Sequence, residues 1–237
     1  MMKRFFQRIK QKEEDPAQPP VLTVAFGDSV TQGVMEYGRL FPEGVYHRLF
    51  QTALEKRFGE ATFSTLNAGV SGSAATQALS RLERDVIRHH PDLVLLAFGL
   101  NDCLEGPGNL SQFSESLRTI CAAVRSKTSS DLIILTPPFM AHRLDESKIH
   151  PKHRGVVASS IVRAQCEGFL DVYADELRSI ACSEEAILAD VHALWGSLKA
   201  EGIDTDTYLC NGLNHPNEKG QKMICNVLLE SIPQLND

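Results

Sequence analysis

The sequence of 237 residues contains no apolar run of the roughly 20 residues that a membrane-spanning helix requires. It has no internal repeat and no low-complexity tract. With 43% hydrophobic and 23% charged residues, it is far from disordered, collagen-like or coiled-coil compositions. Basic residues are in the minority, because 24 Lys and Arg stand against 30 Asp and Glu, a formal charge of -6. This sign disfavours binding to phosphate backbones, so we expect no nucleic-acid partner and a soluble chain with one large α/β domain.

Cysteine is present, but the sequence lacks any CxxC pair. The six cysteines are scattered along the chain, and no export signal precedes them. We therefore expect free thiols and a cytoplasmic protein.

Residues 1–20 differ in composition from the rest. The first ten residues are basic and begin like a signal peptide, but charges interrupt the apolar stretch that such a peptide needs. A solvated terminus is the simpler interpretation, and a basic helix that contacts an anionic membrane is the alternative. The Pro-rich stretch 15–20 indicates a linker, so we place the folded domain at residues 21–237.

Strand and helix patterns alternate along the remainder of the chain. Short apolar runs that predict strands lie at 21–26, 62–66, 92–98, 132–136 and 186–189. Helical patterns lie at 45–58, 74–90, 111–127, 169–181, 192–200 and 217–232. The near-continuous apolar run at 92–98 is typical of a parallel sheet that is covered on both faces. The sequence therefore predicts an α/β fold with a parallel sheet of about five strands between helices.

Ligands of such sheets bind beyond the carboxyl ends of the strands, and four small polar clusters fall in or near those places. The clusters are GDSVTQG at 27–33, NAGVSG at 67–72, GLND at 99–102 and NGLNHPN at 211–217. Together they suit acyl transfer. Ser29 is a candidate nucleophile and His215 its base, while the N–H groups of Ser29 and Gly72 and the amide of Asn101 are candidate oxyanion donors. Each residue alone has a plainer explanation, as a cap or a turn, and only their joint occurrence favours a catalytic site.

With these four blocks the sequence resembles the SGNH hydrolase superfamily, the GDSL-type esterases and lipases. The resemblance extends from the first strand to the last helix. It implies a flavodoxin-like three-layer α/β/α sandwich, a nucleophilic Ser29, His215 as base, and an oxyanion hole formed by Ser29, Gly72 and Asn101. It also implies that the reaction needs no metal and no organic cofactor.

The sequence departs from the family pattern at two positions. Val30 replaces the leucine of the family name, a minor exchange in a position expected to pack inward. Gly212 stands where the family usually has the aspartate that orients the catalytic histidine. Three explanations remain open: Asn211 orients the ring, a carboxylate of Asp190, Asp204 or Asp206 does so, or Ser29 and His215 act as a dyad. We favour Asn211 or the dyad equally.

Other candidate residues have weaker support. His142, His150 and His153 resemble a metal cluster, but no Cys or carboxylate completes a ligand spacing, so a surface loop is the better interpretation. His192 follows a predicted strand and is a rival base. Cys103 adjoins the GLND block, and we interpret it as a packing residue.

The function expected from these observations is hydrolysis of carboxylic esters of small molecules, with short-chain acyl or acetyl esters, including those of sugars, as the preferred substrates. The segment 139–167 is the only evident material for a lid or wall. A non-catalytic binding protein on the same fold and an acyltransferase with the same residues are the alternatives.

Overall fold

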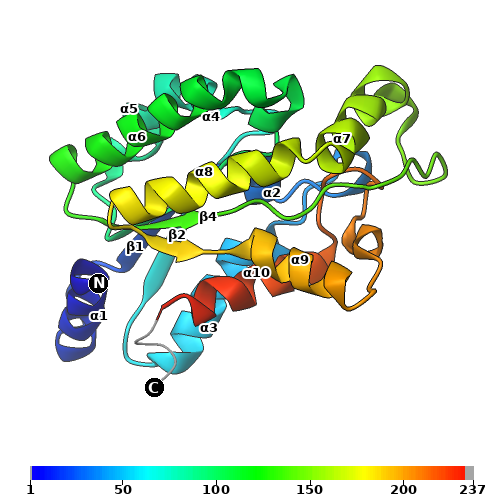
Figure 1. The fold of residues 1–237 in the computed structure, drawn as a ribbon. Coiled ribbons are helices and arrows are strands. Elements are labelled where there is room, and N and C mark those ends of the chain that lie inside the picture. Colours follow the sequence, from blue (N-terminus) through cyan, green and yellow to red (C-terminus); the bar gives the residue numbers. More distant parts are fainter. Residues whose placement is uncertain (1, 233–237) are drawn as a thin grey trace.

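The computed structural model describes residues 2–232, and its centre is a five-stranded sheet in the order β2-β1-β3-β4-β5 (Figure 1). Every neighbouring pair of strands is parallel. The strands are β1 (Val21–Gly27), β2 (Phe63–Gly69), β3 (Leu93–Ala97), β4 (Asp131–Leu135) and β5 (Ile187–Ala189). This confirms the predicted parallel α/β architecture, and the strand order is that of flavodoxin-like sheets.

Helices cover both faces of the sheet (Figure 1). One layer holds α4 (Ala75–Ala78), α5 (Leu82–Asp85), α6 (Leu110–Lys127) and α8 (Phe169–Ser183), and the other holds α3 (Tyr46–Arg57), α9 (Val191–Ala200) and α10 (Glu218–Glu230). Because both faces are covered, the central strand β3 is apolar along its length and Leu93–Leu96 are fully buried. In register, Leu95 lies between Ala25 of β1 and Ile133 of β4.

The helix predicted at 74–90 is broken into α4, α5 and two 3₁₀ turns. Arg81 stands at the interruption, and its guanidinium donates to the carbonyls of Gly27 and Ala68 at the ends of β1 and β2, at 2.9 and 2.6 Å. It also lies over the ring of Phe26, 4.4 Å from the centroid. These contacts fasten the segment to the sheet edge that carries the candidate site.

The structure also contains α7 (Val156–Cys166), which lies in the segment of weak pattern. Its first residues carry their apolar side chains outward, since Val156 is 85% exposed and Val157 is also exposed. A helix is predicted from apolar residues that recur on its core-facing side, and the exposed valines of α7 do not follow this pattern.

The N-terminal segment is a helix, α1 (Lys3–Glu14), that packs on the body of the protein. Phe5 and Ile9 are buried in the main core, and the Phe5 N–H donates to Asp131 at 2.7 Å. The Arg8 guanidinium lies 3.4 Å from Asp92, and Lys12 donates to two carbonyls of the stretch 15–20. The expectation of a solvated terminus was therefore wrong, because Arg8 and Lys12 are buried with partners and the apolar face is covered.

Across residues 2–232, no helix combines the length and apolarity that crossing a bilayer demands. All six cysteines lie within this range and are free thiols, as predicted.

We predict that Phe5→Ala lowers the free energy of unfolding by about 3–5 kcal/mol, because it leaves a cavity where the side chain is fully buried. The matched control on the same helix is Gln7→Ala, at an exposed position, with an expected change within about 0.5 kcal/mol. Urea denaturation followed by circular dichroism measures both. Equal midpoints for Phe5→Ala and the parent chain would contradict the packing of α1.

Candidate active site

The turn after β1 positions Ser29. Asp28 caps α2 (Ser29–Gln32) by accepting a hydrogen bond from the Val30 N–H at 2.9 Å, and Ser29 begins the helix with only 3% of its surface exposed. A Cβ at Gly27 would lie 2.6 Å from the Ala97 carbonyl, so only glycine fits between β1 and β3 here. Val30 is buried, as expected for its position.

His215 approaches from the other end of the chain. Its loop is closed by an antiparallel bridge between Leu209 and Pro216 and by the hydrogen bond from the Cys210 N–H to the His215 carbonyl at 2.9 Å. Nε2 of His215 lies 3.0 Å from Oγ of Ser29, although 186 positions separate the two residues. The nucleophile and base predicted from the sequence are therefore brought within hydrogen-bond distance.

Gln221 on α10 is a positioning residue that the sequence analysis missed. Its buried amide accepts from the Tyr46 N–H at 3.0 Å and donates to the Val30 carbonyl at 3.3 Å. It thereby links the helix that follows His215 to the helix that contains Ser29. An isolated glutamine at helical spacing gives no signal for such a role.

The imidazole of His215 lies in a desolvated environment. Burial lowers the pKa of His215 to about 4, and the backbone carbonyl of Met35 opposes this shift only in part. Among the described residues, no group forms a hydrogen bond with its buried Nδ1. The ring is therefore neutral at pH 7 and able to accept a proton, but no carboxylate holds it.

Asn211, the expected orienter, contacts the backbone instead of the ring. Its Oδ1 accepts hydrogen bonds from the N–H groups of Leu213, Asn214 and His215 at 3.0, 3.0 and 2.9 Å. This Asx arrangement fixes the loop and the Cα position of His215, while within residues 2–232 the imidazole has no side-chain acceptor at Nδ1 and only the Met35 carbonyl acts on the ring as an acceptor.

The surroundings of Gly212 disfavour any side chain at this position. Its φ of +65° is in the left-handed region, and a Cβ there would lie 2.9 Å from the Cβ of Lys148. Any side chain at this position would strain the backbone and displace the segment around Lys148. The departure from the family pattern is thus built into the packing of two loops.

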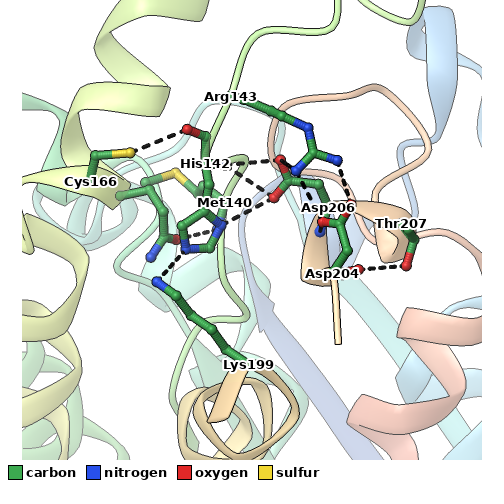
Figure 2. Close-up of polar contacts among 9 residues, drawn as sticks. Met140, His142, Arg143, Cys166, Lys199, Asp204, Asp206 and Thr207 are labelled. Carbon is green, nitrogen blue, oxygen red and sulfur yellow. Dashed lines mark hydrogen bonds and ion pairs between the residues drawn. The ribbon is translucent and has the colours of Figure 1, made fainter. Parts of the chain in front are cut away.

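The three alternative carboxylates bind other partners than His215, and two of them belong to the polar cluster of Figure 2. Asp206 lies 3.1 Å from Nδ1 of His142, and Asp204 pairs with Arg143. Asp190 accepts from Arg178 and from the Thr136 hydroxyl, at 2.8 and 2.9 Å. In the described chain, none of them makes a contact with His215, and the geometry is that of a dyad.

The candidate oxyanion donors lie in two adjacent loops. Gly72 is exposed with a φ of +76°, and the Asn101 side-chain amide donates to the Ser73 carbonyl at 3.2 Å. A cavity of about 300 Å³ has both residues in its lining, together with Gln77, Asn109 and Gln112. The opening beside these donors is therefore polar.

Asp102 holds these loops together and was not singled out from the sequence. Its carboxylate accepts from the Ala75 and Gly99 N–H groups at 2.8 and 3.0 Å. Burial raises the pKa of Asp102 to about 6, and burial likewise raises that of Asp28 to about 7. Both carboxyl groups serve the local backbone, as their hydrogen bonds to N–H groups show.

Two of the weaker candidates have other partners. His192 faces Asp171, with Nε2 3.0 Å from Oδ1. Cys103 is fully buried and donates to the Leu100 carbonyl, which agrees with a packing role. No group of potential ligands able to hold a metal ion occurs anywhere in residues 2–232, the range that contains His142, His150 and His153.

A hydroxyl, a neutral imidazole and nearby amide donors are the parts that acyl transfer requires. The sequence model of the GDSL-like lipase/acylhydrolase family matches residues 25–223. No curated protein gives a sequence match.

Solved structures resemble the whole fold. LAE5, an α/β hydrolase from the metagenome of Lake Arreo, Spain, is 24% identical, with a TM-score of 0.69 over 92% of this chain and 97% of that one. Axe2, an acetylxylan esterase from Geobacillus stearothermophilus, is 20% identical, with a TM-score of 0.68 over 90% and 94%. A lipase/acylhydrolase from Enterococcus faecalis is 22% identical, with a TM-score of 0.66 over 89% and 94%. At these identities the structural similarity shows a shared fold. The family model matches most of the chain, and this protein therefore belongs to the GDSL-like lipase/acylhydrolase family.

Proposed function

We propose that this protein is a serine hydrolase that cleaves carboxylic esters with short acyl chains, acetyl esters in particular. Membership of an acylhydrolase family supports ester hydrolysis in general. The observation that carries the specific proposal is the 3.0 Å contact between Ser29 Oγ and His215 Nε2. The loop of Gly72 contacts the helix of Ser29, because the Ser71 N–H donates to the Gln32 side chain at 2.9 Å.

In the proposed reaction, Ser29 Oγ attacks the ester carbonyl carbon while its proton passes to His215 Nε2. The carbonyl oxygen becomes an oxyanion, which accepts hydrogen bonds from the Ser29 and Gly72 N–H groups and the Asn101 amide. The tetrahedral intermediate collapses, the ester C–O bond breaks, and His215 returns the proton to the leaving alcohol. Water, deprotonated by His215, then attacks the acyl-enzyme and releases the carboxylic acid and free Ser29.

The absence of a carboxylate beside His215 affects the rate. An aspartate stabilises the imidazolium that forms during attack, and in a serine-protease triad its replacement by asparagine lowers kcat by about 10⁴. Here burial disfavours the charged ring, so the transition state relies on the oxyanion donors. We therefore expect a slow enzyme or one adapted to activated esters.

The substrate proposal is supported by a structural neighbour. Axe2, with the same fold, is described as an acetylxylan esterase, and solved variants of it are described as catalytic mutants with a serine or an aspartate replaced by alanine. In the present protein, the polar cavity of about 300 Å³ beside Gly72 and Asn101 is lined by neither Ser29 nor His215, so the acetyl preference rests on this neighbour.

We predict that a fluorophosphonate labels the protein at Ser29, because the neutral His215 3.0 Å away activates the hydroxyl. Intact-protein and peptide mass spectrometry locates the adduct. Ser29→Ala should lose both the label and the hydrolysis of p-nitrophenyl acetate. Equal ester turnover by Ser29→Ala and the parent protein would support a non-catalytic role for this site.

The pH dependence follows from the pKa of His215, which burial lowers to about 4. The base must be unprotonated, so kcat/KM should fall below about pH 4 and stay level from about one unit above that value. If the ring had the ordinary pKa of about 6.5, kcat/KM would instead begin to fall near neutral pH. Acetate release measured from pH 3 to 8, with folding checked by circular dichroism, distinguishes the two. A limb near 6.5 would contradict a desolvated, unpaired imidazole.

Asn101→Ala should lower kcat by about 10²–10³ with a smaller effect on KM, because the oxyanion exists only along the reaction path. Asn109→Ala is the matched control, since Asn109 lines the same cavity without a proposed role in catalysis. Steady-state kinetics on one acetyl ester provides the comparison. Equal losses in the two variants would remove Asn101 from the oxyanion hole.

A further inference from the structure

Tyr37 is held in an unusual conformation on the surface. It lies in a hairpin closed by the bridge between Val34 and Leu40, and its φ of 56° is in the left-handed region that bulky residues avoid. Its side chain is nevertheless 64% exposed, so burial does not compensate for this conformation. Such backbone strain concentrates at functional sites, which makes the ring of Tyr37 a candidate for ligand contact.

Two histidines extend the exposed ring into a row. The centroids of Tyr37 and His150 lie 5.4 Å apart, and those of His150 and His153 lie 5.8 Å apart. These rings come from two segments far apart in sequence, the hairpin 34–40 and the loop 139–155. We call the three rings of Tyr37, His150 and His153 the ring platform.

The two segments that carry the ring platform adjoin the loops of Ser29 and His215. On the hairpin side, the Val34 N–H donates to the Ser29 carbonyl at 3.0 Å. On the loop side, the Ala141 N–H donates to the Leu213 carbonyl at 2.7 Å. Ile149, next to His150, lies 3.6 Å from where a Cβ of Gly212 would stand. Both segments of the platform therefore contact the loops that position the catalytic pair.

The loop that carries the two histidines is anchored away from the platform. His142 contacts Asp206 and Lys199, with Nε2 2.9 Å from the Lys199 Nζ, and the Cys166 thiol donates to the His142 carbonyl (Figure 2). Arg154 donates to the carbonyls of Ile149 and Glu146. The two histidine rings are thus presented by a segment that several hydrogen bonds hold in place.

We propose that the ring platform binds the alcohol portion of the ester, and that this portion is a sugar. This inference rests on the proposed function. Aromatic rings offer an apolar face to the C–H groups of a sugar ring, and the imidazole nitrogens beside them exchange hydrogen bonds with its hydroxyls.

Kinetics with two esters tests the proposal. For glucose pentaacetate, Tyr37→Ala should raise KM about tenfold with kcat nearly unchanged, because stacking is uniform binding that is lost equally from ground and transition states. Methyl acetate is too small to reach the platform, so its kcat/KM should stay the same. Tyr37→Phe keeps the ring and should retain most of the affinity. Leu40→Ala, also exposed and in the same hairpin, is the matched control.

A binding measurement separates this proposal from the proposed function. Methyl glucoside is titrated into Ser29→Ala and into the double variant Ser29→Ala/Tyr37→Ala, followed by NMR of the aromatic side chains. Shifts in the first protein that disappear in the second support the platform even if the parent protein hydrolyses nothing. Equal loss of activity on both esters in Tyr37→Ala, or binding of the glucoside that does not depend on Tyr37, would overturn it.

Discussion

The contact between Ser29 and His215 depends on where a parallel sheet ends. β1 has β2 on one side and β3 on the other, so Ser29 stands where the strand order reverses and the following loops diverge. The histidine arrives from a loop near the C-terminus, and Gln221 ties its helix to the helix of Ser29. Arg81 and Asp102 fasten the neighbouring strand ends and loops. A 3.0 Å contact between side chains from opposite ends of the chain is therefore supported by the core and by a few buried polar groups.

Burial of this pair has opposing consequences for a base without a carboxylate. It keeps His215 neutral well below pH 7, so the ring accepts a proton over a wide range of pH. In the proposed reaction, the same desolvation disfavours the imidazolium that forms when Ser29 attacks. In a complete triad, an aspartate offsets this penalty; here Asn211 fixes only the backbone of the histidine loop. The proposed mechanism therefore assigns stabilisation of the developing charge to the oxyanion donors.

Much of the fold was predictable, because continuous apolar runs and strand-end glycines report directly on a buried parallel sheet. The catalytic candidates were found because Ser29, Gly72, Asn101 and His215 lie in short local motifs. The packing of α1 on the body of the protein was not predictable, because the ion pair of Arg8 requires Asp92, which lies far away in the sequence. Nor could the sequence tell whether Asn211 faces an imidazole or three backbone N–H groups, because both arrangements use the same residues at the same spacing.

Gly212 and the ring platform lie on two loops that pack against each other. Gly212 adopts a left-handed backbone, and Lys148 and Ile149 lie close to it. The loop of Lys148 continues to His150 and His153, and the ring of His150 contacts that of Tyr37. A side chain at position 212 would strain the backbone and displace the segment around Lys148. A change at position 212 would therefore affect both the loop of His215 and the loop that supplies two rings of the proposed sugar-binding surface.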